Sequence, residues 1–180
     1  MIGGICRCFR KISSSSSMAT VTTVKQSISL GEYTQRRSNL VNKLRHMVPE
    51  IRNKRVIVIL RSAIRQFYAP DVPYPFHQCS YFRYFTGLNE PDAVLIITAE
   101  SEREPKSILY IEERSDKQAL WEGPGLSATE IANISGLDEI KERNKLIPDL
   151  RKLVLNAVGC AVSYDTATIH AIRDGLPEVN

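Results

Sequence analysis

The chain has 180 residues, of which 43% are hydrophobic and 24% charged, and a formal net charge of +4. This composition is typical of one globular domain with a tail, and no apolar run approaches the ~20 residues of a membrane helix. The first 31 positions carry four basic residues and no acid, so basic and acidic residues balance in the remainder. We therefore expect no membrane span and no clustered positive face for nucleic acid.

The N-terminal segment, residues 1–31, has the composition of a mitochondrial transit peptide. It is rich in Ser and Thr, has three early basic residues, and its first acidic neighbour is Glu32. A plain disordered tail fits the serine run equally well. Initiation at Met18 would remove the early basic residues and leave a cytoplasmic product, whereas the full sequence indicates a mitochondrial one.

The first predicted element is an amphipathic helix over Ser29–Val48, ended by Pro49. Ser29 and Glu32 have the spacing of a capping box, which would satisfy two free backbone N–H groups. Residues 55–60, "RVIVIL", are a β-branched apolar run typical of a strand buried on both faces. A long loop should follow and continue through the aromatic stretch, because prolines exclude helix before Pro70, Pro73 and Pro75.

Residues 93–99 and 107–113 are separated by a charged turn, and this pattern predicts a β-hairpin. Residues 120–126 form a turn, and a short helix should follow over 127–134, because Ser127 and Glu130 repeat the capping-box spacing.

Three further elements are expected towards the C-terminus: a helix over Leu146–Leu155, a strand over Cys160–Tyr164, and a helix over 167–174. Strands and helices alternate around one hairpin. The fold class is therefore α/β, with a mixed β-sheet flanked by helices.

No complete active site is visible in the sequence. Hydrolase, zinc-peptidase, P-loop and dinucleotide motifs are absent, which also leaves a nucleotide-binding domain with little support. Of the histidines His46, His77 and His170, only His77 has the context of a site, and none has a partner at metal-ligand spacing. We assign no catalytic or metal-binding residue and expect no cofactor on this chain.

The stretch "YPFHQCSYFRYFTGLNEPDAVLII", with "YTQRRSNLVNKL" before it and "LWEGPG" after it, resembles the N-terminal domain of Xaa-Pro aminopeptidase (aminopeptidase P). The likeness covers about residues 32 to 125 and is closest to the mitochondrial branch of that family. Three positions depart from the family pattern: Tyr81, Arg83 and Leu88. Arg83 replaces a large apolar residue, which makes the usual shape of the substrate pocket doubtful.

The resemblance implies a creatinase/aminopeptidase P N-terminal domain over residues 32–180. It also implies a separate pita-bread catalytic domain, which we expect to be absent from this chain, as in a natural isoform or a truncated gene model. That domain removes a residue preceding proline, using two Asp, one His and two Glu that bind metals, commonly manganese. Asp138 and Asp149 have the interval of the two metal aspartates, which we interpret as coincidence because no His or Glu ligands follow.

The resemblance further implies a domain that helps oligomers form and directs the aromatic stretch towards a catalytic cleft. Expected partners are subunits of its own family or the full-length enzyme, and peptide substrates; a non-enzymatic regulator that binds peptides or subunits is the alternative. Ordinary core packing of the aromatic rings and a turn role for Asp71 are the alternatives that remain open. The candidate cleft or interface residues are Asp71, His77, Phe82, Arg83 and Tyr84.

Overall fold

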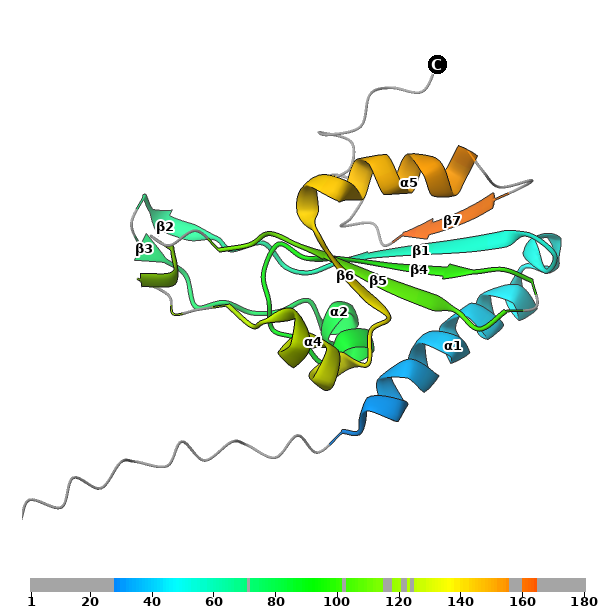
Figure 1. Ribbon diagram of the computed structural model, residues 1–180, viewed down its shortest axis with the longest axis horizontal. Coiled ribbons are helices and arrows are strands. Elements are labelled where there is room, and N and C mark those ends of the chain that lie inside the picture. The colour runs from blue at the N-terminus through cyan, green and yellow to red at the C-terminus, as the bar shows by residue number, and fades with distance from the viewer. Residues whose placement is uncertain are drawn as a thin grey trace, which may run out of the picture.

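The computed structural model describes residues 28–70, 72–101, 103–114, 118–120, 123 and 125–155, and the backbone of 160–164. Its main feature is one mixed five-stranded sheet with helices on both faces (Figure 1). The predicted α/β class with a mixed sheet is confirmed. The strands of this sheet are β1 (Arg55–Arg61), β4 (Val94–Ala99), β5 (Lys106–Ile111), β6 (Glu139–Glu142) and β7 (Cys160–Tyr164).

The strand order is β6-β5-β4-β1-β7. The central strand β4 runs antiparallel to both of its neighbours, β1 and β5, as expected of a hairpin and the strand that precedes it. The two outer strands are parallel to the strands that they join, β6 to β5 and β7 to β1. The hairpin and the strands over 55–60 and 160–164 were expected from the sequence, and all three are confirmed.

The helices pack on both faces of this sheet (Figure 1). The described helices are α1 (Leu30–Met47), α2 (Ser80–Thr86), α4 (Ala128–Ser135) and α5 (Leu146–Leu155), with 3-10 turns η1 (Pro49–Ile51) and η2 (Arg143–Lys145). On one face, buried Val41 of α1, Phe82 of α2 and Ile131 of α4 join a core with alternate residues of β1, β4 and β5. On the other face, Leu146, Leu150 and Leu153 of α5 pack against the remaining residues of these strands.

The two predicted capping boxes have opposite outcomes. At α4 the box is present: the Ser127 hydroxyl accepts a hydrogen bond from the Glu130 N–H, and Glu130 accepts one from the Ser127 N–H at 2.8 Å. At α1 the predicted box is wrong, since Ser29 makes no side-chain cap. There Glu32 pairs instead with Arg36 one turn later, so the carboxylate is not available to the helix end.

The aromatic stretch is not all loop, which corrects the sequence prediction. Ser80–Thr86 forms α2, whose inward side chains Phe82 and Thr86 are fully buried. Gly87 ends the helix in the left-handed conformation, with φ of 73°. A helix of seven residues has too few turns for a clear apolar period, so its stability comes from burial of these side chains.

Two other elements were not expected. A short hairpin of β2 (Phe67–Ala69) and β3 (Val72–Pro73) interrupts the predicted loop and lies beyond the end of the main sheet (Figure 1). Strand β6 was missed because its sequence, "EIKE", is charged, as suits an exposed sheet edge. The segment 1–27 and the predicted helix over 167–174 lie outside the described residues.

Within the described ranges, no helix combines the length and the apolar character needed to cross a bilayer.

Candidate functional site

The candidate site lies where β1 ends, and there the segment 74–79 folds back against residues 61–66. Gln78 holds the two segments together: its Oε1 accepts hydrogen bonds from the backbone N–H of Ala63 at 2.8 Å and of Cys79 at 2.9 Å. Its Nε2 donates to the carbonyl of Glu90 at 2.8 Å. One amide side chain therefore satisfies three backbone groups that no sheet or helix would satisfy.

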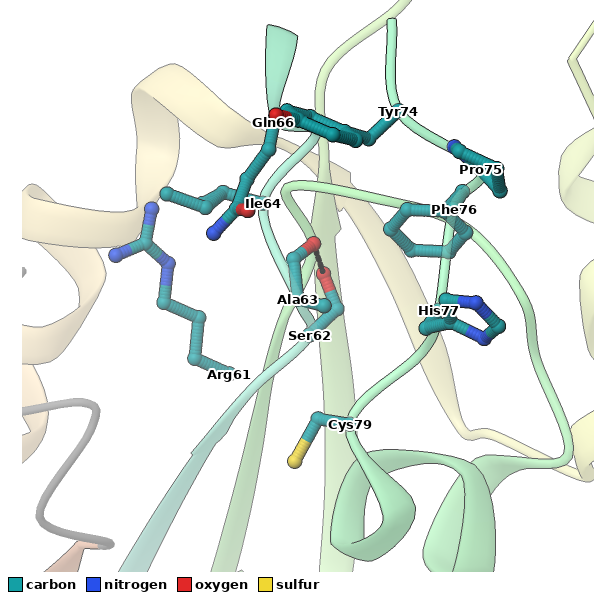
Figure 2. A pocket seen from close by; sticks show the side chains of 10 residues that line it. All are labelled: Arg61, Ser62, Ala63, Ile64, Gln66, Tyr74, Pro75, Phe76, His77 and Cys79. Carbon is teal, nitrogen blue, oxygen red and sulfur yellow. Dashed lines mark hydrogen bonds between the residues drawn. The ribbon is translucent and has the colours of Figure 1, made fainter. Parts of the chain in front are cut away.

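These segments line an open pocket of about 510 Å³, which we call the β1-end pocket. Its volume falls in the range of small-ligand sites. Figure 2 shows Arg61, Ile64 and Gln66 on one side of it and Pro75, Phe76 and His77 on the other. No acidic side chain lines the pocket among the described residues. The full lining is Arg61, Ser62, Ala63, Ile64, Gln66, Tyr74, Pro75, Phe76, His77 and Cys79.

Arg61 is the charged group of this pocket, and it forms an ion pair with Asp92. Its Nη2 lies 4.0 Å from Oδ1 of Asp92, too far for a hydrogen bond. Its Nε is buried and has no hydrogen-bond partner among the described residues. Burial and the Arg61 charge both lower the pKa of the neighbouring Arg143, while Asp92 and Glu112 raise it. Two arginines and two carboxylates therefore lie close together at this end of β1.

The candidate residues divide between this pocket and α2. His77 lines the β1-end pocket and is exposed. Phe82 is fully buried in the core, so a ligand could reach it only if the core opened. Arg83 and Tyr84 lie on the exposed side of α2 and do not line the pocket. Asp71 lies outside the described residues.

Tyr84 belongs to the contact between α1 and α2. The guanidinium carbon of Arg36 lies 4.3 Å from the centre of the Tyr84 ring, and Arg36 Nη1 donates to the Tyr84 carbonyl at 2.9 Å. The neighbouring Phe85 ring meets Tyr84 edge-on at 5.0 Å. Tyr84 is still 52% exposed, so a partner can contact it without disturbing this cation–π pair.

The two aspartates with the metal-site interval have separate partners. Asp138 accepts hydrogen bonds from the N–H and hydroxyl of Ser107, at 2.7 and 2.6 Å. Asp149 accepts from Lys141 Nζ at 2.8 Å and from the Tyr110 hydroxyl at 3.1 Å. The hydrogen bond from Lys141 is the largest cause of the lowered pKa of Asp149. Burial is the largest cause that raises the pKa of Tyr110, to about 12.

Among the residues that the structure describes, no three His, Cys, Asp or Glu side chains come close enough to hold a metal ion. The described side chains therefore do not fit the manganese pair that the resemblance implies, and we derive no chemical step through manganese.

The sequence reasoning missed Arg61 and the bridging role of Gln78. Both had a weak signal: Arg61 is a charge at the end of an otherwise apolar strand, and Gln78 stands inside the motif that carries the resemblance. Neither signal predicts which groups the side chain contacts in the folded chain.

Comparison with known proteins gives one consistent result. Residues 33–159 match the family described as aminopeptidase P, N-terminal domain. Xaa-Pro aminopeptidase 3 of Dictyostelium discoideum is 31% identical over 99 residues, covering 54% of this chain and 19% of that protein. The human protein of the same name is 27% identical over 134 residues, covering 71% of this chain and 26% of its own length. The chain thus spans only a minor part of these curated relatives.

Solved structures agree with this result. An Escherichia coli aminopeptidase P in its low-pH form matches with a TM-score of 0.58 and 29% identity, over 71% of this chain and 27% of that one. A Bacillus anthracis structure matches with a TM-score of 0.65 over 85% of this chain and 38% of its own. Its identity is 20%, so that second match supports the fold alone.

Proposed function

The chain belongs to the aminopeptidase P N-terminal domain family, and from this premise we propose that it serves as the non-catalytic N-terminal domain of a proline-specific metalloaminopeptidase. The observation that carries the proposal is the family match over 33–159, which includes strands β1, β4, β5 and β6 of the sheet and the aromatic stretch. In this role the domain shapes a substrate cleft and helps subunits associate. It does not cleave peptides by itself.

The lack of activity is proposed on chemical grounds. Metal-assisted hydrolysis needs a ligand set that binds the ions and leaves room for an attacking water. The described residues offer no group of three metal-ligating side chains, and Asp138 and Asp149 are engaged elsewhere. The resemblance implies that manganese is held by a catalytic domain, so this chain would contribute contacts to the cleft and no chemistry.

A fluorogenic Xaa-Pro peptide tests this proposal. The purified 180-residue chain, supplied with manganese, should release no fluorophore above the rate of buffer alone. A full-length Xaa-Pro aminopeptidase is the positive control. Turnover that rises in proportion to the chain concentration and stops on addition of a chelator would refute the proposal.

A second candidate function is that of a regulator that binds peptides or subunits without an enzymatic role. It is favoured by the exposed apolar side chains near the β1-end pocket, since such patches mark interaction sites. Size-exclusion chromatography with full-length enzyme separates the two roles. Co-elution supports a binding role, and elution of the chain at its own volume at every ratio argues against it. The exposed side chains are Ile64, Phe67, Tyr68, Val72 and Tyr74.

We also propose that the chain is directed to mitochondria, with a cytoplasmic form if translation starts at Met18. The composition of residues 1–31 supports this, because basic residues without acids respond to the membrane potential. A fluorescent protein fused after residue 31 should enter mitochondria. The same fusion started at Met18 should stay in the cytoplasm, and mitochondrial import of both would contradict the assignment.

A further inference from the structure

Most of the segment between β1 and α2 lies outside the hydrophobic core. None of the described residues of 63–79 has a buried side chain, although Ser62 before it and Phe82 after it are buried. Its middle part is the β2–β3 hairpin, which lies beyond the end of the main sheet (Figure 1). We call residues 64–70 and 72–77 the arm, with one leg before the hairpin and one leg after it.

Both ends of the arm are held by backbone hydrogen bonds. On one side, the Asp92 N–H donates to the carbonyl of Ala63 at 3.1 Å. On the other side, the Arg83 N–H donates to the carbonyl of Cys79 at 3.0 Å, in the first turn of α2. Ala63 and Cys79 are therefore fixed to the body of the domain, and the arm projects between them.

The side chain of Gln78 joins these two ends. Its Oε1 accepts hydrogen bonds from the N–H groups of both Ala63 and Cys79, and its Nε2 donates to the carbonyl of Glu90. All three bonds lie at the base of the arm. A segment with few buried contacts opens at a lower free energy than a core strand, because opening it uncovers little apolar surface. How often this arm opens should therefore depend on the bonds at its base.

The two legs of the arm also form two walls of the β1-end pocket. Ile64 and Gln66 lie on the first leg, and Pro75 and His77 lie on the second (Figure 2). The Tyr74 N–H donates to the Gln66 carbonyl at 2.9 Å, which holds the legs together. A pocket with walls on two legs keeps its shape only while the legs stay together.

We propose that the arm opens and closes as one unit while the sheet stays folded, and that the three hydrogen bonds of Gln78 set how often it opens. The closed arm forms the β1-end pocket, and the open arm separates its walls. A molecule that contacts both walls would therefore bind the closed arm preferentially. This motion belongs to the chain alone and does not rest on the proposed function, which the turnover assay tests.

Hydrogen exchange of single amides, followed by nuclear magnetic resonance, tests the motion in the unaltered 180-residue chain. The Tyr74 amide reports on the arm, and the amides of β4 report on the core, since β4 is paired on both sides. Tyr74 should be protected at least about a hundredfold less than the β4 amides. Low urea should speed the β4 amides but not Tyr74, because opening the arm exposes little surface.

Variants of Gln78 test its role. Gln78→Met keeps the length of the side chain and removes all three hydrogen bonds, each of which changes an equilibrium by about fivefold. Tyr74 should then exchange at least about tenfold faster, although its own acceptor is Gln66. Gln78→Asn is a milder variant, in case Gln78→Met does not fold. Its amide is one methylene shorter and cannot reach all three partners, so Tyr74 should exchange about fivefold faster or more.

Gln66→Met is the matched control. Gln66 lies on the arm and lines the same pocket, but it is exposed and its side chain makes no hydrogen bond among the described residues. This variant should leave the protection of Tyr74 within about twofold of the unaltered chain, as for an ordinary surface change.

Four results would overturn the proposal. In the unaltered chain these are Tyr74 protection equal to that of β4, and Tyr74 exchange that rises with urea as steeply as β4 exchange does. Among the variants they are Tyr74 exchange that neither Gln78 variant speeds, and exchange that Gln66→Met speeds as much as the Gln78 variants do.

Discussion

Arg37 joins the ends of two helices, and replacing it should destabilise the domain. Its side chain is 2% exposed, and its Nη1 donates to the carbonyls of Phe85 at 2.9 Å and Ser135 at 3.0 Å. Its Nη2 donates to Gly136 O at 2.6 Å and to Thr34 Oγ1 at 3.2 Å. Three of these acceptors are carbonyls at the C-terminal ends of α2 and α4, where no helical N–H follows and a cation is favourable.

The expected loss follows from these three carbonyls. A hydrogen bond contributes about 1 kcal/mol net, and more when one partner is charged. Arg37→Met keeps most of the side-chain volume but leaves all three acceptors unpaired. Part of the loss is regained because the guanidinium no longer has to be desolvated, the same burial that lowers the pKa of Arg37. We expect a decrease of about 2 to 4 kcal/mol in the free energy of unfolding, a large share of the total.

Urea unfolding followed by far-ultraviolet circular dichroism measures this loss, with Arg103→Met as the exposed control. Hydrogen exchange gives a local readout: the amides of Gly87 and Gly136 close the last turns of α2 and α4 and should exchange faster in Arg37→Met only. An unfolding free energy within about 0.5 kcal/mol of the unaltered chain, the range of ordinary surface changes, would refute the reasoning.

Two further outcomes test the packing and the charges. Gly87→Ala should lower the unfolding free energy by about 2 kcal/mol or more, because φ is 73° and the added Cβ would lie 2.5 Å from the Tyr33 hydroxyl; an unchanged urea midpoint would contradict this. Lys141 and Tyr110 hydrogen-bond the Asp149 carboxylate, whose pKa is lowered from 3.8, so its stabilising effect is present at neutral pH and is lost as the pH falls through the lowered value. The stability gap between the unaltered chain and Asp149→Asn should therefore narrow in acid, and a gap that stays constant down to pH 2 would contradict the charge role.

Elements with a strong local pattern were predictable from the sequence. The helix over Leu146–Leu155 has the predicted bounds because its apolar period faces one side of the sheet. The buried run in β1 and the capping box at Ser127 are likewise local signals. The capping box at Ser29 failed because a second local partner competes with it. Glu32 could cap α1, but Arg36, one turn later, pairs with it instead.

The site was less predictable than the fold, since it depends on contacts between distant segments. Gln78 orders the pocket through Ala63 and Glu90, and these are far from it in sequence. The identity of Arg61 was visible in the sequence, but its ion pair with Asp92 and the burial of its Nε without a hydrogen-bond partner among the described residues are properties of the folded chain. The resemblance directed attention to the aromatic stretch, yet Phe82 there is a core residue, as the alternative reading of the rings allows.

Metal content tests the central claim most directly, because a chain that only shapes or docks needs no bound cation. The 180-residue chain would be incubated with manganese, dialysed, and measured by elemental analysis together with its protein concentration. We expect manganese far below one ion per chain. Retention of two ions per chain, the content of a two-metal hydrolase site, together with cleavage of an Xaa-Pro peptide, would contradict it.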